Sequence, residues 1–325
     1  MNREISQRIT IISFFAMISV ICWHCYCGSE VEKYILPLFF YWSVPWFFLV
    51  SGFLLAYSME HKGIVELIKS KCTSLLIPYL LWSLVGAWII GFSNCGSALD
   101  VFGIVTERIF PMGNQSLWYL RSVIVFSAGG ILIYTAFYRF ARIRIIATSI
   151  TLCTFMIALN SFLLQISTGS SPVYFCIGLT MWSFRDCLLM RKKRISYVVF
   201  VLAAILFGLC KIVYFAKGYS SAVPGGTFLT NLSTCLFVVG IWIGVGLLSK
   251  EMLEKVICLK FLHVQAVVYF MHYPLLRKVI DTVHWKENIA FVFYCCIAPV
   301  LFVGCAILIK VMMPRFYRIA SGGRV

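Results

Sequence analysis

The amino-acid sequence predicts an all-α fold: a polytopic membrane helix bundle of about ten transmembrane helices, with both chain ends in the cytoplasm. Of the 325 residues, 61% are hydrophobic and only 12% are charged, and the mean hydropathy is +0.93. A soluble domain cannot bury so much apolar surface in one core, because close to half apolar is already typical of soluble proteins. The surplus therefore faces lipid.

Ten apolar runs account for most of the chain. Crossing the hydrocarbon takes roughly 20 apolar residues per helix, so the length allows about ten passes joined by short loops. The runs cover residues 9–27, 36–57, 73–92, 116–138, 145–163, 172–189, 195–215, 228–248, 264–280 and 289–313. No soluble domain of ordinary size fits between them, so residues 1–325 are expected to form a single transmembrane domain. The ninth run contains His272 and Pro274, and its helix is expected to be bent or broken there, because proline removes a helical hydrogen-bond donor.

The lysines and arginines predict the orientation. With the N-terminus inside, 20 of the 28 basic residues fall in cytoplasmic segments. The other 8 are Lys33, Arg108, Arg121, Lys211, Lys217, Arg277, Lys278 and Lys286. Because cytoplasmic loops are enriched in basic residues, this asymmetry favours an even number of spans with both ends inside. Membrane topology also explains the net charge of +16. We therefore do not expect a nucleic-acid partner.

Metal chemistry and ion-coupled transport are not favoured. Most of the 14 cysteines lie inside apolar runs, where cysteine behaves as a small hydrophobe, and no CxxC pair lies beside paired histidines. We therefore predict no metal site. The 12 acidic residues lie nearly all at helix ends or in loops, which leaves few groups for coupling transport to an ion gradient.

Three ionisable residues at membrane depth are candidates for catalysis, because such groups are costly there and tend to be functional. His24 lies in the outer third of the first apolar run, and a neutral imidazole can remove a proton from a hydroxyl acceptor as a general base. His272 lies near the middle of the ninth run. Arg121 follows Trp118 by three residues, so both share one helix face, where Arg121 is placed to hold an anionic group.

Each candidate has a structural alternative. His24 is also typical of an interfacial histidine beside Trp23, and Arg121 of an arginine that snorkels to the outer interface. His272 is equally consistent with a core histidine bonded to a backbone carbonyl that Pro274 has freed.

Two further features are candidates for substrate binding. Ser51 precedes Gly52 in the second run, a pair that allows close helix approach and that packing alone would explain. Basic residues at cytoplasmic helix ends usually only fix topology, but they are also suited to the phosphates of a nucleotide-bearing donor. These residues are Lys69, Lys71, Arg139, Arg142 and Arg144.

Six segments, taken in order, resemble acyltransferase family 3, the membrane-bound acyl-CoA-dependent O-acyltransferases that modify bacterial glycans. The segments are FFAMISVICWH, WSVPWFFLVSGFLL, KSKCTSLLIPYLLW, SLWYL, PVYFCIGLTMW and VVYFMHYPLL. The resemblance covers nearly the whole chain. It implies a ten-helix protein of the bacterial inner membrane, with lipid around it, that uses acyl-CoA (by default acetyl-CoA) as a co-substrate and holds no permanent cofactor. It also implies that His24 is essential for transfer to a hydroxyl of a glycan or lipid-linked sugar.

One position departs from the family pattern. The family usually has an arginine eleven residues before the first-helix histidine, and here that position is Ser13. Eleven helical residues make three turns plus about 20°, so Ser13 and His24 share a face about 16 Å apart along the axis. Arg8 points about 160° away from His24 and cannot replace the arginine unless the helix starts late or breaks. Either another basic residue fills the role, or catalysis is weakened, or the chain is a divergent or inactive member.

The expected mechanism has His24 as the base, Trp118 as an apolar or sugar-stacking wall, and Arg121 or His272 as a stabiliser of the oxyanion. The alternative is a glycan exporter or a catalytically silent partner of a polysaccharide synthase. The missing arginine favours that alternative, whereas the retained His24 and His272 oppose it. The oligomeric state stays open.

Overall fold

The structure is a computed structural model that describes residues 2–25, 36, 39–91, 117–137, 143–159, 170–185, 193–216, 224–283 and 288–323. Within these ranges every regular element is helical, and a helix lies in each of the ten apolar runs. The ten are α1 (Arg3–His24), α3 (Ser43–His61), α5 (Ile77–Gly91), α7 (Trp118–Ala136), α8 (Arg144–Leu159), α9 (Ser171–Ser183), α10 (Lys193–Ala216), α11 (Pro224–Leu247), α13 (Gln265–Val283) and α14 (Asn288–Met312).

Six of these helices, counted over the described residues, are long and apolar enough to cross a membrane. They are α1, α3, α7, α10, α11 and α14. The chain is therefore a multi-pass, all-helical membrane protein, while the total of ten spans and the orientation stay predictions. Shorter helical elements lie between the long ones: α4 (Ile64–Lys71), η1 (Cys72–Leu76), α12 (Lys250–Ile257), η5 (Lys260–His263) and α15 (Pro314–Ala320).

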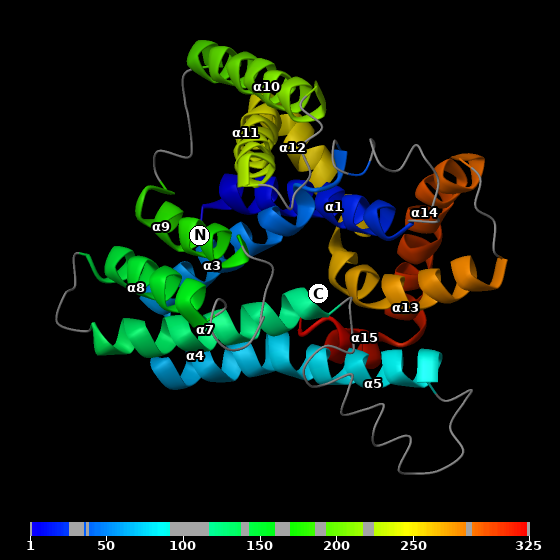
Figure 1. Ribbon diagram of the computed structural model, residues 1–325. Coiled ribbons are helices and arrows are strands. Elements are labelled where there is room, and N and C mark those ends of the chain that lie inside the picture. Colours follow the sequence, from blue (N-terminus) through cyan, green and yellow to red (C-terminus); the bar gives the residue numbers. More distant parts are fainter. Residues whose placement is uncertain are drawn as a thin grey trace.

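Helix α1 is central to the bundle, in contact with α3, α11, α12, α13 and α14 (Figure 1). Its N-terminus is capped by the side chain of Asn2, which accepts a hydrogen bond from the backbone N–H of Glu4. Most of its side chains are buried, polar ones included. Because α1 has neighbours on several sides, each of its faces lies against a different part of the molecule.

Helices α3 and α9 approach each other through two reciprocal glycines. A Cβ atom on Gly52 would lie 1.9 Å from the carbonyl oxygen of Phe175, and one on Gly178 would lie 1.9 Å from that of Leu49. Only glycine permits two backbones to lie this close. The close approach predicted at Gly52 is therefore confirmed, and its counterpart is the glycine of the PVYFCIGLTMW segment.

The chain from Ile64 to Gly91 is continuously helical, but it widens into a π-turn at Cys72–Leu76. Pro78 has no N–H to donate to the carbonyl of Ser74, which explains a departure from regular α-helix at this point. Gly322, with a φ of +69°, approaches that same Ser74 carbonyl, where a Cβ atom would lie 2.6 Å from the oxygen.

Two hydrogen bonds attach α15 to other parts of the bundle. The indole N–H of Trp82 in α5 donates to the carbonyl of Ala320 over 3.1 Å, and the hydroxyl of Tyr317 donates to the carbonyl of His263 over 3.0 Å. Figure 1 shows α15 lying beside α5. The C-terminal helix is thus an integral part of the fold.

Of the two alternatives predicted for the ninth run, a bent or a broken helix, the break is wrong. Helix α13 runs without interruption from Gln265 to Val283, through His272 and Pro274. A proline inside a helix leaves only one carbonyl without its usual partner, and packing against α1, α5 and α14 holds α13 together across that point.

Candidate active site

His24 and His272 lie next to each other although 248 positions separate them in the sequence. His24 is at the end of α1 and His272 is in the middle of α13, and their ring centroids are 5.2 Å apart. The ring of Tyr273 packs edge-on against His24 at 4.8 Å. The fold therefore brings together the two histidines that the sequence had singled out.

A hydrogen bond determines which nitrogen of His272 carries the proton. Its Nδ1 lies 2.5 Å from the carbonyl oxygen of Tyr269, and because a carbonyl only accepts, Nδ1 must donate. In the neutral ring Nε2 then has a free lone pair. His272 is fully buried, and among the described residues this Nε2 has no hydrogen-bond partner. The backbone contact expected for a core histidine exists, although Pro274 would free the carbonyl of Phe270 rather than that of Tyr269.

A cavity of about 270 Å³ lies beside His24, and we call it the His24 cavity. Its walls include Val20, Trp23, His24, Tyr41, Phe48, Trp118 and Tyr174. Trp118 packs against Phe48 with ring centroids 5.8 Å apart, so its indole forms a firm aromatic wall. The cavity thus combines one half-buried imidazole with aromatic surfaces of the kind on which sugars stack.

A second cavity, of about 280 Å³, lies further along α1 towards its N-terminus, and we call it the Ser13 cavity. Polar groups from five helical elements reach it, those of Thr10, Ser13, Ser51, Tyr119, His263, Gln265 and Tyr269. Gln265 Oε1 is buried and has no partner within the described part of the chain. This cavity is suited to an elongated ligand with amide and hydroxyl groups.

A row of three rings connects the two cavities. Tyr269 lines the Ser13 cavity, and its ring centroid is 5.6 Å from that of His272. His272 in turn lies against His24, which lines the His24 cavity. Ligands in the two cavities would therefore approach the histidine pair from different sides.

Ser51 holds part of this wall in place. The hydroxyl of Tyr119 donates its single proton to the carbonyl of Phe47 over 3.1 Å, so Ser51 must donate to Tyr119 across their 2.7 Å contact. The ring of Tyr119 then packs edge-on against Tyr269 at 5.8 Å. Ser51 thus lines the Ser13 cavity and also supports its wall through the hydrogen bond to Tyr119.

Ser13, at the family's arginine position, is buried and accepts a hydrogen bond of 3.0 Å from the indole N–H of Trp46. Arg8 lies on another side of α1, where it forms an ion pair with Glu4 and packs over the ring of Trp242. Since α1 is one continuous helix, the geometric expectation that Arg8 points away from His24 is met. Arg8 does not supply the missing charge at Ser13.

Arg121 takes a different direction from its helix neighbour Trp118. The described lining of the His24 cavity includes Trp118 but not Arg121. Arg121 instead lies close enough to Tyr79 of α5 to interact electrostatically with its hydroxyl. An action of Arg121 on a ligand in the His24 cavity would require the side chain to move.

The predicted donor-binding basic residues are distributed over separate sites. Arg144 joins α7 to α8: its Nε donates to the carbonyl of Tyr134 over 2.6 Å and its guanidinium lies 3.7 Å from the centre of that ring. Lys71 lines a separate apolar cavity between α4 and α7. Arg139 and Arg142 lie outside the described residues.

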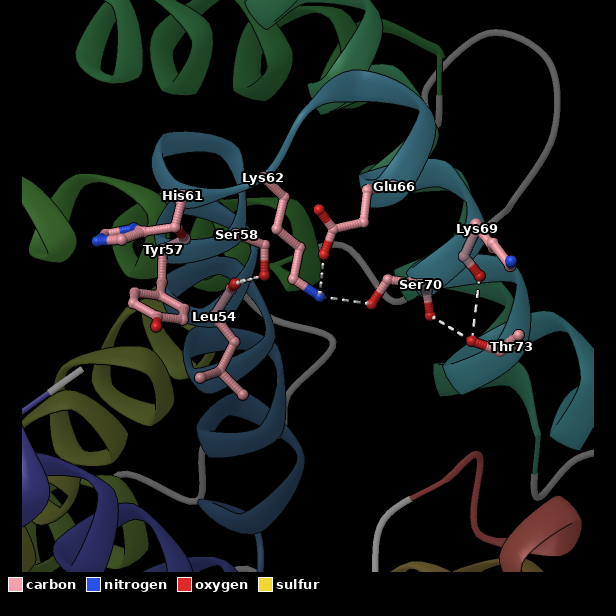
Figure 2. Close-up of polar contacts among 9 residues, drawn as sticks. All are labelled: Leu54, Tyr57, Ser58, His61, Lys62, Glu66, Lys69, Ser70 and Thr73. Atoms are coloured by element: carbon pink, nitrogen blue, oxygen red, sulfur yellow. Dashed lines mark hydrogen bonds and ion pairs between the residues drawn. The ribbon is translucent and has the colours of Figure 1, made fainter.

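Figure 2 shows the corner between α3 and α4, where Lys69 lies near another lysine. Lys62 donates to the hydroxyl of Ser70 over 3.1 Å and forms an ion pair with Glu66 at 3.8 Å. Thr73 donates to the carbonyls of Lys69 and Ser70, whereas the side chain of Lys69 is exposed and directed away from Lys62. Lys69 therefore remains accessible to a phosphate.

Sequence reasoning missed three residues of the site, namely Tyr119, Gln265 and Tyr269. One sign was present for Tyr269, since it precedes His272 by three positions and so shares its helix face. Tyr119 and Gln265 gave none, because their roles depend on contacts between helices distant in sequence.

Comparison with known proteins identifies the family of the chain. A family model described as an acyltransferase domain matches residues 8–310, nearly the whole chain. No curated protein and no solved structure shows significant similarity to the chain.

Proposed function

The chain belongs to acyltransferase family 3, and on that premise we propose that it is a membrane O-acyltransferase. It moves an acyl group, acetyl by default, from acyl-CoA to a hydroxyl of a surface glycan or a lipid-linked sugar. The observation that carries this proposal is the contact of His24 and His272 at the edge of a cavity walled by Trp118. A membrane chain with this pair between two cavities suits a reaction that joins two substrates.

In the proposed reaction His24 removes the proton of the acceptor hydroxyl as its oxygen attacks the thioester carbonyl. The new carbon–oxygen bond forms and the carbon–sulfur bond breaks. The sulfur of CoA leaves and takes up the proton that His24 had accepted, so the enzyme returns to its starting state. Trp118 and its aromatic neighbours form the surface against which the sugar ring stacks.

His272 acts on His24 in this scheme rather than on the oxyanion. With Nδ1 donating to Tyr269, the neutral ring has only an acceptor to offer at Nε2. Nε2 makes no bond to His24 in the described structure, but in the proposed reaction it accepts an N–H of His24 and stabilises that ring after it has gained a proton, as the third member of a catalytic triad does. His272 is thus proposed as a positioning residue.

The donor is proposed to enter through the Ser13 cavity. The unpartnered Oε1 of Gln265 accepts an amide N–H of the pantetheine arm, and the hydroxyls of Thr10 and Ser51 lie along the same wall. Exposed basic residues such as Lys69 bind the phosphates of CoA in the cytoplasm. The acceptor comes from the other side, which suits a glycan at the outer face of a bacterial inner membrane.

A second function is favoured by one observation. Ser13 carries no charge and is bonded to Trp46, so the position of the family arginine serves packing in this chain. A glycan exporter, or a silent partner of a polysaccharide synthase, would tolerate that loss.

The experiment that separates the two functions is NMR measurement of O-acetyl groups on the host's surface polysaccharide. The strains are a deletion strain and the same strain complemented with wild type or with His24→Ala. We expect acetylation to disappear on deletion and to return with wild type alone. Normal acetylation in the deletion strain, with a changed amount or length of polysaccharide, would replace the enzyme with the exporter or partner function.

A further inference from the structure

Arg8 lies in the second turn of α1, just before the first apolar run, yet its side chain is only 5% exposed. One of its Nη atoms donates to Glu4, which is itself 46% exposed. Its Nε has no hydrogen-bond partner among the described residues. A guanidinium has five N–H donors, and leaving buried donors unused is costly. Arg8 therefore has donors available for a ligand.

The side chain of Arg8 lines a cavity of about 250 Å³, which we call the Arg8 cavity. It lies between α1, α3 and α9 on one side and the α10–α11 hairpin on the other, and its remaining walls are almost wholly apolar. Figure 1 shows α10 at the edge of the molecule, with α11 between it and α1. Ile177 and Val239 line the cavity and are also exposed, so the cavity opens sideways to the lipid.

The polar end of the cavity is well defined. Ser196, one turn into α10, and Gly246, at the end of α11, line it together with Arg8. A Cβ atom on Gly246 would lie 2.3 Å from Arg8 Nη1, so the guanidinium occupies the space that this glycine leaves open. The exposed Arg194 belongs to the same end of α10. A cation thus lies at one end of an apolar slot that is open to the membrane.

We propose that the Arg8 cavity binds an anionic phospholipid, with a hydrocarbon chain in the apolar slot and the phosphate on Arg8. The sideways opening and apolar walls exclude a freely soluble anion as the ligand. The charge requirement comes from Arg8, whose remaining donors match phosphate oxygens. This site is separate from the histidine pair and does not rest on the proposed function.

Glu4 is the competitor of the lipid phosphate. Its carboxylate already holds one donor of Arg8, and being half-exposed it can be solvated when a phosphate approaches. Glu4→Gln removes that competition while leaving Arg8 in place. The proposal therefore requires Glu4→Gln to increase lipid retention, whereas a purely structural Glu4–Arg8 pair would give no increase.

Native mass spectrometry of the purified full-length chain in detergent tests the site, with added dioleoyl phosphatidylglycerol or dioleoyl phosphatidylcholine. Wild type is expected to retain the anionic lipid about tenfold more strongly, as suits one charge-assisted contact. Arg8→Gln should abolish the preference, and Val239→Trp should reduce retention of both lipids by filling the slot. Arg194→Gln removes one exposed charge at the same end and should change nothing.

Three results would overturn the proposal. One is equal retention of the two lipids by wild type, and another is no increase in retention in Glu4→Gln. The third is an equal loss of preference in Arg194→Gln and Arg8→Gln, which would assign the effect to general surface charge. If Arg8→Gln fails to fold, the result for Glu4→Gln decides, because that variant keeps the arginine.

Discussion

Two sides of α1 carry opposite kinds of chemistry. The side that carries His24 and Ser13 faces cavities lined by imidazoles, hydroxyls and an amide. The side that carries Arg8 faces an apolar cavity with a single buried cation. One helix therefore separates a chamber suited to acid–base chemistry from a slot suited to a lipid. In this membrane protein the buried charge of Arg8 therefore lies apart from the candidate active site at His24 and His272.

The largest expected effect is on the histidine side. His24→Ala should lower acyl transfer by about 1,000-fold, because a positioned general base contributes roughly that factor. The measurement is transfer of radiolabelled acetyl from acetyl-CoA by purified protein. His61→Ala is the matched control, since His61 lies at the far end of α3, where its Nδ1 contacts the carbonyl of Tyr57 and its ring packs against Trp182. Equal losses in both variants would refute the role of His24.

The next effect separates positioning from direct catalysis. His272→Ala should reduce kcat by about 10- to 100-fold and shift the pH profile, because His24 loses its neighbouring acceptor. His272→Gln can present an amide oxygen near the place of Nε2 and should recover part of the rate. The contrary result is that both variants yield less folded protein while the folded fraction keeps the wild-type pH profile. His272 would then have only a structural role.

A third variant tests the contact between α3 and α9, which borders both the His24 cavity and the Arg8 cavity. Pro45 and Tyr174, on α3 and α9, line the His24 cavity and the Arg8 cavity alike. Gly178→Ala should destabilise the protein by about 3 kcal/mol, because the new Cβ meets backbone atoms that cannot move aside. Thermal unfolding in detergent measures this. Gly304→Ala, where a Cβ meets nothing within 4 Å, should be neutral.

The smallest expected effect concerns the departure from the family pattern. Ser13→Ala leaves the buried indole N–H of Trp46 without an acceptor and should cost about 1 kcal/mol of stability. Ser19→Ala is the control, because Ser19 donates only to the carbonyl of Phe15 within its own helix. An unchanged melting temperature for Ser13→Ala would mean that the Trp46 contact contributes nothing.

The sequence predicted the helices well and the site in part. Apolar runs are local, so a helix could be placed in each of them, and Gly52 could be predicted as a point of close approach. Residues that meet across the bundle were harder, because Tyr119 and Gln265 reach the Ser13 cavity only through inter-helical packing. The direction of the Arg121 side chain could not be predicted from residue type either, because it depends on Tyr79, which lies on another helix.

The packing of α15 against α5 has a consequence for folding during translation. The hydrogen bond from Trp82 to Ala320 joins residues 238 positions apart. During synthesis α5 is therefore complete long before the ribosome reaches α15, and until then the Trp82 indole lacks its Ala320 acceptor. This part of the bundle can be completed only late in translation, and until then an unfinished chain exposes a surface that insertion factors or proteases can recognise.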